Sequence, residues 1–250
     1  MNTIKMVLRR IILLYILSFI FIVVISLISL KNTADSTPYI DGVLLYKVAN
    51  KDIGALIPFF LLPCIYGYIY YSDKKNGFCD YIGSRVSISK YKLSILIVTF
   101  FSCFLLVFVS ERIVFYAAVL LKGNIVSLGT PFDTTVLPPI TLGSPYIDSI
   151  LLAAWRAGIL AIYSICAVVL SFNTKSFFVI ATGGILYRFL SDLIGTITPF
   201  FGYTSLVAAG SLDGFPQVSM FQRIVCLTLF ILFIILVNFI GSIKRRKELI

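Results

Sequence analysis

The stretch LSILIVTFFSCFLLVFVSERIVFYAAVLL, residues 93–121, decides the fold of this chain. It carries two charged residues, Glu111 and Arg112, and is otherwise apolar or bears small hydroxyl and thiol groups. A helix needs about 20 mostly apolar residues to cross the roughly 30 Å hydrocarbon core of a bilayer. The stretch is longer than that, so it predicts a transmembrane helix, with two charges inside it that need an explanation.

Five other apolar runs accompany this one. Hydrophobic residues make up 59% of the chain and charged residues only 13%, whereas a soluble domain carries about 25% charged residues. The predicted spans are residues 11–30, 53–71, 93–121, 149–171, 177–196 and 220–242. The sequence therefore predicts one all-α polytopic membrane domain over residues 1–250. No small-x-small cleavage site follows the first run, so we expect it to be a retained helix and not a signal peptide.

The distribution of basic residues predicts the orientation. If the amino terminus is cytoplasmic, the inner segments hold 13 of the 21 lysines and arginines and the outer loops hold four. The inner ones are Lys5, Arg9, Arg10, Lys74, Lys75, Arg85, Lys90, Lys92, Lys175, Lys244, Arg245, Arg246 and Lys247. This bias follows the positive-inside rule. It predicts a multi-pass protein of the cell membrane with both termini cytoplasmic, and it explains the net charge of +10 without nucleic acid as a partner.

The residues that several kinds of catalytic or binding site require are missing from this chain. There is no histidine, which removes Ser-His-Asp and Cys-His catalysis and the usual zinc sites. Glu111 is the only glutamate before Glu248, so paired-glutamate acid–base or metal sites are not expected. The sequence contains no G-x-x-x-x-G-K-[ST] loop, the motif that holds nucleotide phosphates in many ATP-binding proteins. We therefore expect no enzyme activity, no metal and no cofactor in this chain.

The segment NGFCDYIGSRVSISKYKLS, residues 76–94, is long for a connection between two spans. On a helix, five of its residues fall at i, i+3, i+4, i+7 and i+8, which is one continuous face. They are Phe78, Tyr81, Ile82, Arg85 and Val86. Ser87 and Ser89 offer N-cap oxygens for the next span. The pattern predicts a short amphipathic helix that either anchors to anionic lipid or docks into a groove of a cytoplasmic protein.

The same region resembles the inner loop of ABC-2 type exporter permeases. That loop has an acidic or polar start and a glycine, then an R-x-S-like turn and a Lys-Tyr pair before the third helix. Gly77, the run SRVS at 84–87 and the pair Lys90 and Tyr91 match this pattern. The chain departs from it in two respects: Asp73 stands where many members have a glutamate, and the amino-terminal tail is too short for a long elbow helix.

The resemblance implies a coupling helix, formed by the five residues above, that sits in a groove of an ATP-binding cassette subunit. ATP and Mg²⁺ would then lie on that partner, and a second permease copy or paralogue would complete the complex. Family members also have short re-entrant helices between spans five and six. The stretch TPFFGYTSLVAAGSLDGFPQ, residues 198–217, is similar in position and composition. An ordinary outer loop remains the alternative.

Six charged residues lie inside the predicted spans, all in the outer halves. They are Glu111, Arg112, Arg156, Arg188, Asp192 and Arg223. Each costs about 2.5–3.5 kcal/mol in the membrane on insertion scales, so each needs a partner or water. They predict either interhelical ion pairs that fix packing, with Arg188 and Asp192 one helical turn apart, or an outward vestibule for an anionic group. Trp155, Tyr39, Tyr46 and Tyr203 are expected to be interfacial anchors.

Together these observations predict the membrane subunit of an ABC-2 type exporter, with an apolar or amphipathic substrate such as a peptide, lipid or drug. The alternative is a membrane protein without transport chemistry, for bacteriocin immunity or peptide sensing. An ion-driven carrier is a weaker third option, because the sequence has no internal repeats and no acids in the inner halves of its spans.

Overall fold

A computed structural model describes residues 3–37, 41–49, 53–83, 86–122, 145–174, 176–183, 186 and 220–247. Within these ranges the chain is helical almost throughout and contains no strand. The helices are α1 (Thr3–Ser36), α2 (Gly42–Ala49), α3 (Ile53–Lys75), α4 (Phe78–Gly83), α5 (Ile88–Lys122), α7 (Pro145–Asn173) and α10 (Met220–Lys247). The prediction of an all-α fold is confirmed for the part of the chain that is described.

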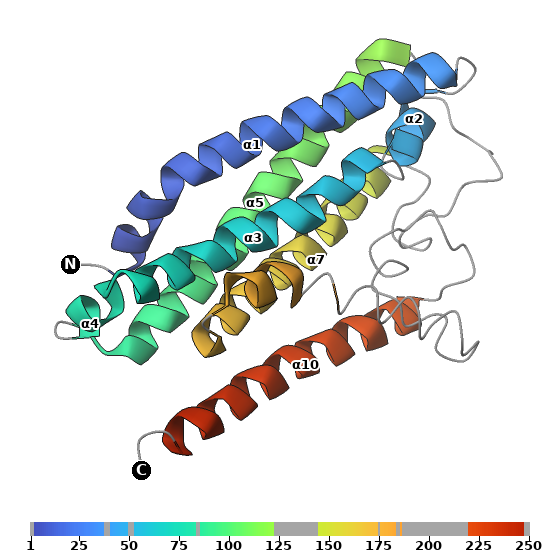
Figure 1. Ribbon diagram of the computed structural model, residues 1–250. Helices are drawn as coiled ribbons and strands as arrows, with labels where there is room; N and C mark the ends of the chain where they lie inside the picture. The colour runs from blue at the N-terminus through green and yellow to red at the C-terminus, as the bar shows by residue number, and fades with distance from the viewer. Residues whose placement is uncertain are drawn as a thin grey trace.

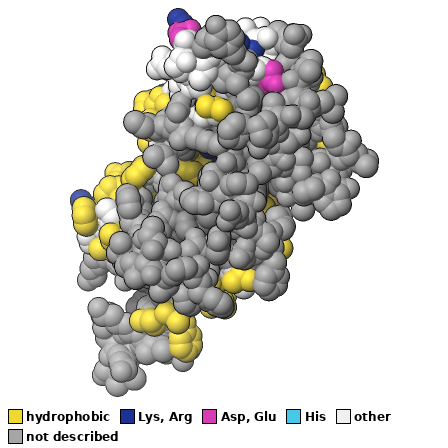
Figure 2. All heavy atoms as spheres, turned by 90° about the vertical axis from the view of Figure 1, so that its right-hand side faces the viewer, with side chains coloured by type: hydrophobic (Ala, Val, Ile, Leu, Met, Phe, Trp, Pro, Cys, Tyr) yellow, Lys and Arg dark blue, Asp and Glu magenta, His cyan; other side chains and the backbone are white. Residues whose placement is uncertain are grey.

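Among the described residues, three segments are long and apolar enough to cross a membrane: Ile11–Ser36, Ile88–Lys122 and Ser149–Asn173. Many large apolar side chains of α1, α5 and α10 are exposed, which is costly in water and favourable in lipid. Among the side chains that Figure 2 draws in colour, hydrophobic ones reach the surface in several places. The protein is therefore membrane-embedded.

Helices α1, α3, α5 and α7 pack side by side, and α10 lies against α7 (Figure 1). α7 is the most deeply buried of them, with residues 166–172 wholly inside the bundle. α1 and α5 run in one direction, and α3, α7 and α10 run in the other (Figure 1). The beginning of α1, the end of α10 and α4 lie at the same end of the bundle, called the α4 end below; the opposite end holds α2.

The observed helices extend the predicted spans by a few residues. The first four spans lie within α1, α3, α5 and α7, and the sixth begins with α10 at Met220. Of the fifth predicted span, 177–196, the structure describes helical residues 177–183 and Leu186. The re-entrant segment predicted at 198–217 lies outside the described residues. The sequence left 42–49 as part of an outer connection, whereas it forms the helix α2.

The segment between α3 and α5 contains the short helix and the N-cap that the sequence predicts. Gly77 has a φ of 67°, a left-handed conformation that glycine adopts without the cost of a side chain, and it separates α3 from α4. The helix predicted from Phe78 onward is present as α4, which ends at Gly83. Ser87 Oγ accepts a hydrogen bond from the backbone N–H of Lys90 at 3.4 Å. Ser87 is thus the N-cap of α5, as predicted.

Candidate functional site

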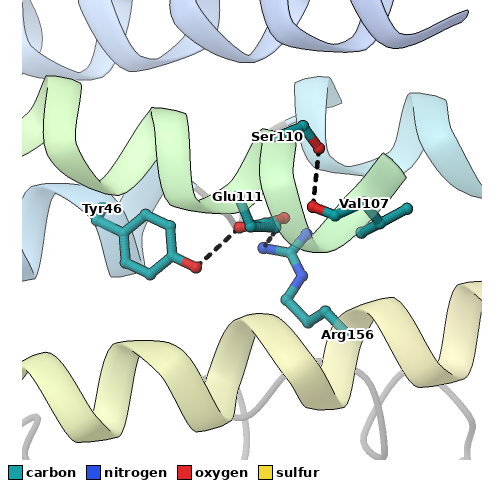
Figure 3. Close-up of polar contacts among 5 residues, drawn as sticks. All are labelled: Tyr46, Val107, Ser110, Glu111 and Arg156. Atoms are coloured by element: carbon teal, nitrogen blue, oxygen red, sulfur yellow. Dashed lines mark hydrogen bonds and ion pairs between the residues drawn. The ribbon is translucent and has the colours of Figure 1, made fainter. Parts of the chain in front are cut away.

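An ion pair joins the two central helices towards the α2 end of the bundle. The Arg156 Nη1 atom on α7 lies 3.2 Å from the Glu111 Oε1 atom on α5, and the two side chains are only 7% and 11% exposed. Figure 3 shows the two side chains converging from facing helices. Because each charge would be costly alone in a membrane interior, the pair gives each the partner that its burial requires.

Tyr46 completes this group from a third helix. Its hydroxyl donates a hydrogen bond to Glu111 Oε2 at 2.8 Å, so both carboxylate oxygens are engaged (Figure 3). α2 has eight residues and is too short to cross a membrane. Burial, reinforced by the neighbouring Glu111 carboxylate, raises the pKa of Tyr46 well above its usual value. The hydroxyl therefore keeps its proton and remains a donor.

The role expected for Tyr46 from the sequence is wrong. Its side chain is 0% exposed and packs edge-on against Phe115, with ring centroids 5.4 Å apart, so it is not an interfacial anchor. α2 can approach α5 because Gly42 has no side chain. A Cβ atom there would lie 2.7 Å from the Cα atom of Val119. The sequence alone does not separate the two cases, because an interfacial tyrosine and a buried one can both stand beside an apolar run.

A cavity of about 10 Å³ lies beside the ion pair. Its polar lining comes from Ser26 and Ser29 of α1 and Ser110 of α5, together with Glu111 and Arg156. The Ser110 hydroxyl donates to the Val107 carbonyl at 2.8 Å (Figure 3). Such a volume suits about one water molecule. The described residues around this pair therefore leave no room for a peptide carboxylate or a drug-sized group.

The other charges of the predicted intramembrane cluster are not gathered at this pair. Arg112 turns towards the start of α7, where Nη1 donates to Ser149 Oγ at 2.7 Å. Its guanidinium carbon also lies 4.6 Å from the ring centroid of Phe115. Arg188 and Asp192 are outside the described residues. Arg223 lies in the first turn of α10, but its side chain is not among those described.

A second polar group lies at the α4 end. Asp73, near the end of α3, is fully buried and accepts a hydrogen bond from the hydroxyl of Tyr91, in the first turn of α5. Lys92 extends over two aromatic rings, with Nζ 5.1 Å from the centroid of Phe172 on α7 and 5.9 Å from that of Tyr70 on α3. These contacts join α3, α5 and α7 at the α4 end of the bundle. Asp73 therefore fixes the two helices that α4 connects.

The predicted docking face of α4 has a buried part and an exposed part in the structure. Ile82 is 3% exposed and belongs to the main hydrophobic core, and Phe78 and Val86 pack against that core. Tyr81 is 53% exposed and stacks on Phe78, with ring centroids 6.1 Å apart. Arg85 lies outside the described residues. The apolar stripe thus seats α4 on its own bundle, and Tyr81 remains accessible to another molecule.

The two groups differ in what they can do chemically. The pair of Glu111 and Arg156 with Tyr46 is enclosed, and both carboxylate oxygens of Glu111 have partners, which suits a packing role. The α4 end presents an exposed aromatic ring on a short helix that is tied to two long ones, which suits the transmission of a contact. Among the described residues, no cluster of His, Cys, Asp or Glu could hold a metal ion. No protein-family model, curated protein or solved structure matches this chain.

Proposed function

We propose that this chain is the membrane-spanning subunit of an ABC-2 type exporter that works with separate ATP-binding cassette subunits. The observation that carries the proposal is the construction of α4. It is a short helix between two long ones, it is held on the bundle by Ile82, and it exposes Tyr81. The sequence around it resembles the coupling segment of that family. A movement imposed on α4 would reach α3 and α5 together, because Asp73 and Tyr91 join them.

The proposed complex contains two such chains, as copies or paralogues, with the substrate pathway between them. The enclosed pair of Glu111 and Arg156 supports this arrangement, because the described residues of one chain leave only a water-sized cavity there. The substrate is proposed to be apolar or amphipathic. ATP and Mg²⁺ are assigned to the cassette subunits, since the chain has no nucleotide-binding loop of its own.

We further propose six spans with both termini in the cytoplasm, including a fifth span at 177–196 and a re-entrant segment at 198–217. The placement of the start of α1, α4 and the end of α10 at one end of the bundle supports this topology (Figure 1). In the cysteine variants Ser36→Cys and Gly143→Cys, an impermeant thiol reagent should label the new cysteine in intact cells. In Asn76→Cys the reagent should react only after the membrane is opened. Labelling of position 76 from outside would rule out this topology.

The functional proposal is tested by isolating the tagged chain from the cells that produce it, in a mild detergent. We expect a subunit carrying a G-x-x-x-x-G-K-[ST] motif to copurify, and the isolated complex to hydrolyse ATP. A matched preparation of an unrelated tagged membrane protein controls for non-specific capture. A homogeneous, folded preparation without any nucleotide-binding chain would contradict the exporter and favour an immunity or peptide-sensing protein.

A further inference from the structure

A groove of about 340 Å³ runs between α1 and α5 near the α4 end. Apart from the hydroxyl groups of Tyr15 and Ser102, its walls are hydrocarbon. The lining residues include Leu8, Ile12 and Tyr15 of α1 and Ile97, Phe101 and Leu105 of α5. We propose that this groove binds an anionic phospholipid from the leaflet at the α4 end. The inference needs only a membrane-embedded chain and does not rest on the transport proposal.

Charge is placed at the mouth of the groove by both helices. On α1, the exposed residues Lys5 and Arg9 precede Ile12 by seven and three positions, so they share its helix face. On α5, the exposed Lys90 precedes Ile97 by seven positions and lies on the same face. Both helices begin at the α4 end and run in the same direction (Figure 1). Three cations therefore lie at one end of this hydrocarbon-lined groove.

The acidic residues of these helices lie far from this end. Asp35 is in the last turn of α1, and Glu111 lies in the second half of α5, paired with Arg156. The mouth thus presents positive charge that neither helix neutralises with a nearby carboxylate of its own. A lipid phosphate is the complementary group, because basic residues near a membrane surface attract anionic lipids.

The length of the groove is close to the depth of one leaflet. At a rise of 1.5 Å per residue, the lining residues cover roughly 10 Å on α1, from Leu8 to Tyr15, and roughly 12 Å on α5, from Ile97 to Leu105. One leaflet of the roughly 30 Å hydrocarbon core is about 15 Å deep. A phosphate held beside Lys5 and Arg9 would therefore leave the groove to accommodate much of one acyl chain.

The charge at the mouth favours a lipid over a second copy as the occupant, because the same face of a second copy carries the same three cations. An acyl chain is also thin enough to follow the irregular walls made by Leu8 and Phe101. Occupation by a second copy is the alternative that the test distinguishes.

The test measures lipid binding to the purified protein by native mass spectrometry, with phosphatidylglycerol and phosphatidylcholine titrated separately. Wild type should bind phosphatidylglycerol more tightly. The triple variant Lys5→Gln/Arg9→Gln/Lys90→Gln should bind it roughly a hundredfold more weakly, at about fivefold for each basic residue near the surface. The control is Lys31→Gln, which neutralises an exposed lysine near the opposite end of α1 and should bind as wild type does.

A second variant tests the groove itself and not the charge. Ile97→Trp fills the groove from its α5 wall and should weaken phosphatidylglycerol binding about tenfold, whereas Ile16→Trp, an exposed site on α1 that does not line it, should not. The proposal is overturned if wild type binds the two lipids equally, if the triple variant binds phosphatidylglycerol as tightly as Lys31→Gln does, or if Ile97→Trp binds normally. Crosslinking of Phe101→Cys to a second copy, with no lipid retained, would assign the groove to a dimer contact instead.

Discussion

Replacing Arg156 by methionine should destabilise the folded protein by about 3–5 kcal/mol, the loss typical of a buried charge deprived of its partner. Methionine keeps most of the side-chain volume but leaves the carboxylate of Glu111 without its counter-charge, with Tyr46 as a neutral donor. The measurement is the free energy of unfolding in detergent, or the temperature at which the monodisperse protein is lost.

A double variant separates pairing from packing. Glu111→Gln/Arg156→Met removes both charges, so it should be substantially more stable than Arg156→Met alone. The amide oxygen at position 111 can still accept a hydrogen bond from the Tyr46 hydroxyl. Arg112→Met is the arginine control. It breaks a hydrogen bond to a serine and a contact with the Phe115 ring but no ion pair, so it should cost less, about 2 kcal/mol. Glu111→Gln is measured alone as well. If its loss and that of Arg156→Met simply add in the double variant, the ion pair does not stabilise the fold as described.

Tyr81→Glu should weaken binding of the cassette subunit by roughly thirty- to a thousandfold, equivalent to about 2–4 kcal/mol for an aromatic residue central to an interface. Because Tyr81 is half exposed, the change should leave the thermal stability of the isolated chain unaltered. Arg85→Glu, a charge reversal on the predicted docking face, should act in the same direction. Binding is measured by copurification and by titration of the isolated subunits.

Two further variants of α4 make this result specific. Tyr81→Phe keeps the ring and should retain the cassette subunit. Ile82→Asp would place a charge in the hydrophobic core, so it should unfold the protein and cannot report on docking. Normal copurification with Tyr81→Glu and with Arg85→Glu would leave α4 only its lipid-anchoring role.

Hydropathy located the helices α1, α3, α5, α7 and α10, because a single apolar run in a membrane satisfies its own backbone groups by forming a helix. The fifth predicted span, 177–196, is described only in part and stays a prediction. Hydropathy also located Glu111 and Arg156, but not as partners, since the sequence does not state which helix faces which. α2 was missed because eight residues are too few to stand out as a span. The amphipathic stripe of α4 predicted its helix but not its orientation: periodicity identifies an apolar face, and the same face can cover the chain's own core or a partner.

The proposed docking of a nucleotide-binding subunit on α4 is tested most directly by photocrosslinking from a light-activated amino acid placed at position 81. The experiment is done in the cells that produce the protein, with the same amino acid at position 36 as the control. We expect an adduct at position 81, and none at position 36, with a chain that carries a G-x-x-x-x-G-K-[ST] motif. Adducts at position 81 with lipid alone, in a folded protein, would show that no such subunit docks there.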